Sequence, residues 1–199
     1  MIAPRLVLFA RYPESGAAKT RLIPAVGAAG AAQIHRRLTE RTHAILQASG
    51  CPVELQFTGA PETAFRAWLG EAITAIPQAD GGLGDRLISA LDPAPVIFFG
   101  ADTPDLDANH VAAAIDALCR NDVVVGPAHD GGYYLIGLNQ PHRFLFENMP
   151  WSTDQVLPET LERLNARQIT HALLPTLADC DRPEDLKNWP YLIAETALP

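Results

Sequence analysis

The 199-residue sequence has no long apolar run and no surplus of positive charge. Its longest apolar stretches, such as Pro95–Ala101, are far shorter than the roughly 20 residues that a membrane-spanning helix requires. The N-terminal residues lead directly into a strand-like segment, without the basic and apolar regions of a secretion signal. The formal charge is −8, whereas a nucleic-acid footprint needs clustered Lys and Arg. We therefore expect a cytoplasmic protein without membrane insertion and without a nucleic-acid partner.

Cysteine is also scarce, and its placement excludes two kinds of cross-link. Cys51, Cys119 and Cys180 are odd in number, far apart and without CxxC spacing. This pattern argues against structural zinc and against a disulfide framework, and it predicts three reduced, mostly buried thiols. The sequence also shows no internal repeat, no low-complexity linker and no break in composition. We expect one domain that spans residues 1–199.

Apolar runs of strand length alternate with segments of helical periodicity. The predicted strands are 5–10, 52–58, 72–76, 96–100, 122–125, 133–138 and 169–174, and the predicted helices are 25–49, 62–69, 85–91, 109–120, 153–166 and 184–189. This alternation is typical of an α/β protein with a mainly parallel sheet between two helical layers. In such open sheets ligands bind outside the carboxyl ends of the strands. The loops after strands are therefore the places to look for chemistry.

The loop after the first strand concentrates basic residues. Arg11, Lys19 and Arg21 lie within eleven positions, in a sequence with only fifteen Lys and Arg. Arg can clamp a diphosphate bidentately and Lys can act as a point charge. The segment matches neither the P-loop nor the dinucleotide-binding glycine pattern. It is either a phosphate-binding loop or a solvated basic loop.

Three further loops carry carboxylates. Asp102 ends the most strand-like segment, a position that suits Mg²⁺, which typically takes one or two protein carboxylates. Asp102 or Asp105 could instead cap the helix that begins near Asp107; we expect Asp102 to serve the metal and Asp105 or Asp107 to serve as the cap. Asp130 begins an Asp-Gly-Gly turn after a strand parallel to that of Asp102, so its carboxylate could face the same cleft. Asp181 lies ahead of Pro183 and Glu184, a pattern that predicts a helix N-cap at Asp181. A metal-binding role for Asp181 is not visible from local sequence.

These segments, in this order, resemble a bacterial glycosyltransferase-like family of the GT-A fold, formerly a domain of unknown function and associated in places with arsenosugar biosynthesis. The matching segments are Phe9–Leu22, Gly100–Leu106, Asp130–Leu138, Trp151–Thr153 and Asp181–Leu186. The match spans nearly the whole chain. More distantly, the layout is similar to that of nucleotidyltransferases that make guanylylated or cytidylylated cofactors.

The resemblance implies roles for these residues. Lys19 and Arg21 become phosphate ligands, and Asp102 and Asp181 hold Mg²⁺ or Mn²⁺. The stretch that contains Gly82, Gly84 and Arg86 becomes a candidate nucleobase or ribose contact, and we add Arg11 to the nucleotide-binding group. Asp130 is the nominated general base, with His129 or Glu14 as alternatives.

The leading functional hypothesis is a metal-dependent glycosyltransferase that moves a sugar from a nucleoside-diphosphate donor to a small acceptor. The first alternative is a nucleotidyltransferase that uses a nucleoside triphosphate and a phosphorylated acceptor and releases pyrophosphate. The first loop argues against this alternative, since Arg11-Tyr12-Pro13 stands where those enzymes usually have a glycine pair. The second alternative is a nucleotide-binding module without catalysis.

Overall fold

Seven short strands form one mixed sheet in the computed structural model, which describes residues 3–194. The strands are β1 (Arg5–Arg11), β2 (Val53–Thr58), β3 (Thr74–Pro77), β4 (Val96–Phe99), β5 (Val123–Pro127), β6 (Tyr133–Leu138) and β7 (His171–Leu173). They lie in the order β3-β2-β1-β4-β6-β5-β7. Neighbouring strands are parallel, except that β6 runs antiparallel to both β4 and β5. The predicted, mainly parallel sheet is confirmed, with one reversed strand inside it.

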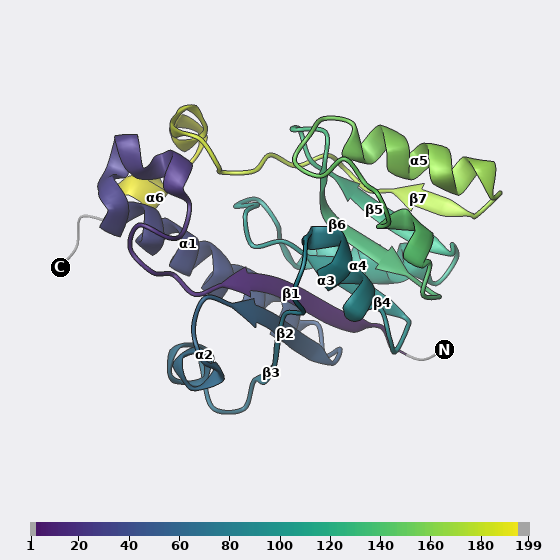
Figure 1. Cartoon of the computed structure of the whole chain (residues 1–199), viewed down its shortest axis with the longest axis horizontal. Coiled ribbons are helices and arrows are strands. Elements are labelled where there is room, and N and C mark those ends of the chain that lie inside the picture. Colours follow the sequence, from purple (N-terminus) through teal and green to yellow (C-terminus); the bar gives the residue numbers. More distant parts are fainter. Residues whose placement is uncertain (1–2, 195–199) are drawn as a thin grey trace.

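Helices connect the strands and cover both faces of this sheet (Figure 1). The α-helices are α1 (Ile23–Ala48), α2 (Glu62–Leu69), α3 (Leu83–Ser89), α4 (Ala108–Leu118), α5 (Val156–Ala166) and α6 (Tyr191–Ala194). The 3-10 helices are η1 (Thr20–Leu22), η2 (Arg143–Leu145) and η3 (Pro183–Asn188). None of the helices within residues 3–194 has the length and apolar character that crossing a membrane requires.

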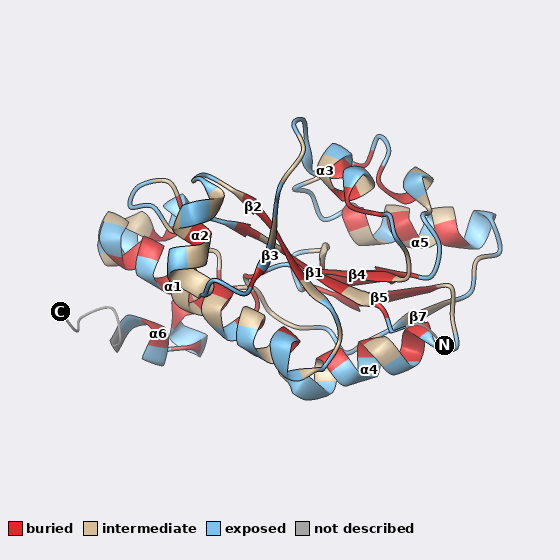
Figure 2. Ribbon diagram, turned by 90° about the horizontal axis from the view of Figure 1, so that it is seen from below, coloured by how far each residue is buried: buried red, intermediate tan, exposed pale blue. Residues whose placement is uncertain are grey.

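The core is divided between the two faces of the sheet because successive side chains of a strand point to opposite sides. Leu6 and Leu8 of β1 pack on the face covered by α1, α2 and α4. Val7 of the same strand packs on the other face, with residues of α3 and α5. Figure 2 shows the buried strands between these two helical layers. The predicted three-layer α/β/α architecture is confirmed.

Two helix predictions and one cysteine prediction are wrong in detail. The helix expected to begin at Thr153 begins at Val156, because Ser152 adopts a left-handed φ of 64° and the Thr153 hydroxyl donates to the carbonyl of Pro150. The helix expected over 184–189 is the 3-10 helix η3, over Pro183–Asn188. Among the thiols only Cys180 is buried; Cys119 is exposed at the end of α4.

The direction of the strands gathers the predicted loops at one edge of the sheet. β1 and β4 are parallel neighbours, and β5 runs in the same direction as β4 because both are antiparallel to β6. The loops that follow β1, β4 and β5 therefore emerge at the same edge. The segment after β7, which is parallel to β5, reaches this edge as well.

Candidate active site

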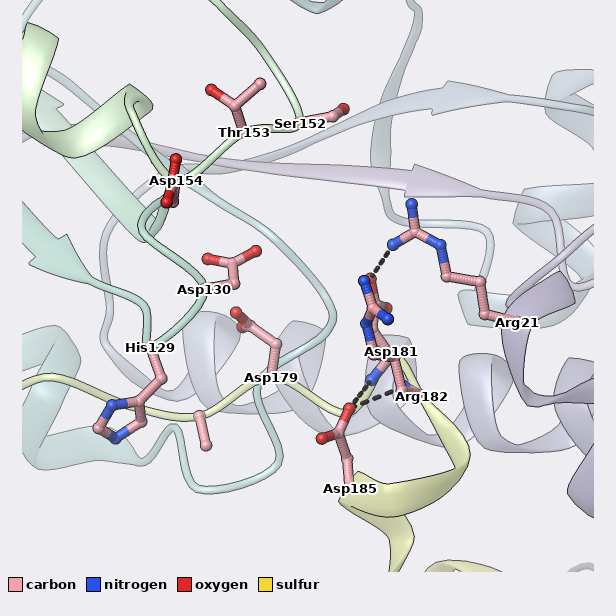
Figure 3. A pocket seen from close by; sticks show the side chains of 11 residues that line it. Arg21, His129, Asp130, Ser152, Thr153, Asp154, Asp179, Asp181, Arg182 and Asp185 are labelled. Atoms are coloured by element: carbon pink, nitrogen blue, oxygen red, sulfur yellow. Dashed lines mark hydrogen bonds and ion pairs between the residues drawn. The ribbon is translucent and has the colours of Figure 1, made fainter.

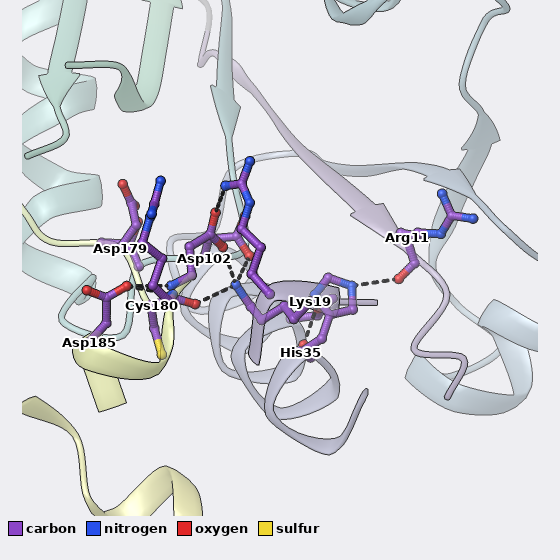
Figure 4. Close-up of polar contacts among 12 residues, drawn as sticks. Arg11, Lys19, His35, Asp102, Asp179, Cys180 and Asp185 are labelled. Atoms are coloured by element: carbon purple, nitrogen blue, oxygen red, sulfur yellow. Dashed lines mark hydrogen bonds and ion pairs between the residues drawn. The ribbon is translucent and has the colours of Figure 1, made fainter. Parts of the chain in front are cut away.

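A buried lysine brings together the two acidic loops of this edge. The side chain of Lys19 is only 4% exposed, and its Nζ lies 2.6 Å from Oδ1 of Asp102 and 3.0 Å from Oδ1 of Asp181. Nζ also donates to the carbonyl of Cys180 at 2.7 Å. An ammonium group has three donors, so these three acceptors account for all of them. Figure 4 shows the lysine among these partners.

The opposite charges at this centre favour the ionised forms of Lys19 and Asp102. Burial alone would lower the pKa of Lys19, but the carboxylates of Asp102 and Asp181 outweigh it and raise that pKa. Burial alone would raise the pKa of Asp102, but the Lys19 ammonium outweighs it by charge and by hydrogen bonding, so this pKa is lowered. Lys19 and Asp102 are therefore both charged at neutral pH. The carboxylates are still reachable from solvent, since the Asp102 side chain is 48% exposed and that of Asp181 is 43% exposed.

Three hydrogen bonds join the Asp102 loop to the C-terminal segment. The amide of Cys180 donates to the carbonyl of Asp102, and the Thr103 hydroxyl donates to Oδ1 of Asp179, each at 2.9 Å. Further along, the indole Nε1 of Trp189 donates to Oδ1 of Asp105, also at 2.9 Å. Trp189 itself is buried against α1. These contacts hold the two acidic segments in register although they lie about eighty positions apart in the sequence.

One capping prediction, Asp105 or Asp107 for α4, is confirmed, and the other is wrong. Asp107 caps α4, because its Oδ1 accepts from the amides of Asn109 and His110. Asp181 is not the N-cap of the following helix; this prediction is wrong. Oδ2 of Asp185 accepts from the amides of Asp181 and Arg182 instead. The Asp181 carboxylate is thereby left to contact Lys19, and its Oδ2 also accepts from Arg21 at 3.5 Å.

A polar cavity of about 550 Å³ opens beside Asp181 (Figure 3). It is lined by Asp130, Asp154 and Asp179, together with Ser152 and Thr153. In Figure 3 the three carboxylates come from separate segments and face a common space, whereas the His129 ring points away from it. Asp130 and Asp181 therefore belong to one continuous surface.

Asp179 is a site residue that sequence reasoning missed. Burial is the main cause that raises its pKa to about 7; the negative charges of Asp130, Asp102 and Asp181 add to the shift, and the hydrogen bond from Thr103 opposes it. A carboxyl group with a pKa near neutrality can both accept and release a proton at working pH. Its only signal in the sequence is its place two residues before Asp181, in a segment whose local pattern predicts a helix N-cap.

The remaining predicted nucleotide contacts lie around this centre rather than in it. Arg11 is exposed, and Figure 4 shows its guanidinium directed away from Lys19. Gly82 and Gly84 line a separate cavity of about 360 Å³ beside Trp151. Arg86 donates to the carbonyl of Gly81 and to the side chain of Gln78, so it braces its own loop.

Gly84 has a packing reason to lack a side chain. A Cβ there would lie 2.5 Å from the carbonyl oxygen of Phe146 and 3.0 Å from Nε1 of Trp151. The glycine thus permits close approach of α3 to the segment that carries Trp151. Gly84 therefore contributes to the site as part of the wall of the cavity of about 360 Å³.

The donor set at the centre fits a hard divalent cation. Two carboxylates converge on one point, and Mg²⁺ commonly takes one or two protein carboxylates and completes its shell with water and substrate phosphates. No cage of three or more His, Cys, Asp or Glu side chains is found among residues 3–194. The two carboxylates that meet at Lys19 are those of Asp102 and Asp181.

Comparison with known proteins places the chain in a family. A family model matches residues 41–153, which is more than half of the chain. The chain belongs to this family. It is described as an uncharacterized protein conserved in bacteria (DUF2064). No curated protein matches this DUF2064 chain in sequence.

Solved structures with the same fold cover this DUF2064 chain almost completely. A provisionally identified nucleotide-diphospho-sugar transferase from Desulfovibrio desulfuricans G20 is 26% identical over 100% of both chains, with a TM-score of 0.87. A 4-diphosphocytidyl-2C-methyl-D-erythritol synthase from Anaerococcus prevotii DSM 20548 is 11% identical over 96% of each chain, with a TM-score of 0.61. Rv0371C from Mycobacterium tuberculosis H37Rv, solved as a complex with manganese, is 15% identical over 97% of this chain and 98% of that one, with a TM-score of 0.57. The α/β fold is thus the one found in nucleotide-diphospho-sugar transferase structures.

Proposed function

We propose that this protein is a divalent-cation-dependent glycosyltransferase that moves a sugar from a nucleoside-diphosphate donor to a small acceptor. The observation that carries the proposal is the convergence of Asp102 and Asp181 on the buried ammonium of Lys19. Two carboxylates and a buried cation at the carboxyl edge of a parallel sheet suit a diphosphate bound together with a metal ion. The likeness to the Desulfovibrio protein supports the same class of donor.

Each side chain has a part in this proposal. Lys19 and Arg21 bind the diphosphate of the donor, and Arg11 at the rim of the loop adds positive charge. Asp102 and Asp181 are the ligands for Mg²⁺ or Mn²⁺, which, when bound, supplies positive charge to stabilise the leaving diphosphate. Asp130 accepts the proton of the acceptor hydroxyl, a positioned transfer that typically contributes about 10²–10⁴-fold in rate. Gly82, Gly84 and Arg86 belong to the segment that contacts the nucleobase or ribose in this proposal.

The manganese complex of the similar Mycobacterium tuberculosis protein makes Mn²⁺ a suitable probe beside Mg²⁺. Arsenosugar biosynthesis, with which the resembled family is associated in places, is one setting for such a reaction. We further propose that residues 1–199 form a single domain that acts on small molecules.

Nucleotidyl transfer is the second candidate function. It is favoured by the likeness of the whole fold to the Anaerococcus synthase, whose name denotes a cytidylylated product. The same Lys19 and the same carboxylates would then face a triphosphate. The two reactions differ in what leaves the donor: a nucleoside diphosphate in glycosyl transfer and pyrophosphate in nucleotidyl transfer.

A thermal-shift screen followed by product analysis tests the proposal. Nucleoside diphosphates, triphosphates and nucleotide sugars are added with and without Mg²⁺ or Mn²⁺, and a ligand that binds the folded state raises its stability. We expect a cation-dependent shift with a nucleotide sugar, and release of the nucleoside diphosphate on turnover. Asp181→Asn should abolish the cation dependence, whereas Asp116→Asn, in an exposed ion pair on α4, should preserve it. Pyrophosphate as the product, or no binding of any nucleotide, would contradict the proposal.

A further inference from the structure

Two cavities that share Arg21 and Asp181 differ in the balance of their charges. One cavity, of about 320 Å³, is lined by Arg11, Lys19 and Arg21, with Asp102 and Asp181 at its inner wall. The other cavity, of about 550 Å³, is lined by five aspartates, among them Asp130, Asp154 and Asp179, and by only two arginines. A phosphate-bearing donor therefore fits the first cavity and is repelled by the second.

These three carboxylates of the second cavity are held in place by the protein. Oδ1 of Asp130 accepts from the amide of Gly132 at 2.9 Å. Oδ1 of Asp154 accepts from the side chain of Gln155, and Oδ1 of Asp179 accepts from Thr103, each at 2.9 Å. Among the described residues, these contacts of the three carboxyl groups thus run through Oδ1, and each group also lines the cavity.

The loops that carry these groups are packed tightly against each other. Gly131 has a φ of 89°, and a Cβ on it would lie 2.5 Å from the backbone of Asp154. The carbonyl of Gly131 also accepts from the amide of Leu157 at 2.8 Å, at the start of α5. A side chain at Gly131 would push the two loops apart. The cavity wall is therefore built to a fixed spacing, and Ser152 and Thr153 line it as well.

We propose that this cavity is the acceptor site and that its acceptor is a polyhydroxylated molecule without phosphate or carboxylate groups. The inference rests on the proposed glycosyl transfer. Carboxylate oxygens accept hydrogen bonds from hydroxyl or ammonium groups, and they repel an anion at short range. A neutral sugar, a polyol or an amino sugar can donate hydrogen bonds to the carboxylates of this cavity. The phosphate ester of the same compound is repelled by them.

The reaction is balanced with this acceptor. The acceptor oxygen forms a bond to the anomeric carbon while the bond from that carbon to the diphosphate oxygen breaks. The diphosphate leaves with the electron pair toward the Lys19 side. The hydroxyl proton passes to the carboxylate of Asp130.

The test uses matched acceptors with the nucleotide sugar that the thermal screen identifies. Glycerol, ribose, glucose and glucosamine are each compared with their phosphate esters, and the kcat/KM for nucleoside-diphosphate release is measured. We expect transfer to unphosphorylated members and about tenfold or more lower kcat/KM for the esters. Transfer only to esters, or to none of the unphosphorylated compounds, would overturn the acceptor proposal. Pyrophosphate release or absent nucleotide binding would instead mark failure of the proposed function.

A charge-reversal variant makes the test specific to this cavity. Asp154→Lys should shift the preference toward the esters by about tenfold, while Asp116→Lys on α4 should not change it. A nucleotide-dependent thermal shift in Asp154→Lys shows that the variant is folded. If Asp154→Asn loses the cation-dependent shift while acceptor preference stays the same, the cavity holds a second cation and the proposal is wrong.

Discussion

Replacing Lys19 with methionine would test the centre of the site directly. Methionine keeps most of the apolar length of the buried side chain but removes the charge and all three donors. Asp102 and Asp181 would then face each other without a cation between them, and the carbonyl of Cys180 would lose its donor. The variant separates the packing role of the lysine from its electrostatic role.

The expected loss of stability in Lys19→Met depends on how far the three charged groups are exposed to water. Removing one partner of a fully buried ion pair costs about 3–5 kcal/mol. Here the lysine is buried but the two carboxylates are nearly half exposed and keep part of their water, so that cost is lower. The unsatisfied Cys180 carbonyl adds about 1 kcal/mol or more. A total of about 3 kcal/mol corresponds to a fall in Tm of about 6–12 °C for a chain of this length.

Thermal unfolding with and without Mn²⁺ is the assay. In the wild-type protein the metal ion must displace the Lys19 ammonium from Asp102 and Asp181. In Lys19→Met no cation has to be displaced, because both carboxylates lack a partner of opposite charge. We therefore expect Mn²⁺ to raise the Tm of the variant more than that of the wild type. Lys187→Met removes the other lysine of the chain, which is exposed on η3, and should change neither Tm nor the cation response. A Lys19→Met protein with wild-type Tm, or with no added response to Mn²⁺, would refute the convergence of these groups.

Three further predictions concern the neighbouring contacts. Because the pKa of Asp179 is raised from 3.8 to about 7, the folded state holds this proton more tightly than the unfolded state, and stability falls as pH rises between these values. Asp179→Asn, which still accepts from Thr103, should therefore be more stable than wild type above pH 7, by at most about 4 kcal/mol; equal urea midpoints at pH 8 would contradict this. Trp189→Phe keeps the apolar contact but loses the bond to Asp105; we expect a cost of about 1 kcal/mol and several-fold weaker Mn²⁺ binding in a thermal titration, whereas unchanged Mn²⁺ affinity would show that this bond does not align the acidic loops. Gly84→Ala should lower stability by about 1–3 kcal/mol because the added methyl group meets backbone, and a calorimetric Tm equal to that of wild type would show that α3 can move aside.

Short-range patterns in the sequence were sufficient for most of the fold. The apolar run Val96–Phe99 and the helical spacing of residues 108–118 depend on near neighbours in the chain, so both elements were predicted within two residues. The end of a strand is equally local, and for this reason the strand pattern alone assigns Asp102 and Asp130 to one edge of the sheet. The insertion of β6 between β4 and β5 was not predictable in this way, because it depends on which strands pair across the chain.

The tertiary structure alone decided how the site is assembled. Nothing in the segment around Asp181 indicates that it meets Lys19, since the local pattern predicts only a helix cap. The N-cap is instead Arg182, whose amide donates to Asp185 in the first turn of η3, and the amide of Cys180 donates to the carbonyl of Asp102 across the fold, next to the contact of Asp181 with Lys19. The altered pKa of Asp179 has the same origin, because burial and neighbouring carboxylates come from distant segments. The sequence therefore determined which residue types reach the edge of the sheet, and long-range packing determined which of them meet.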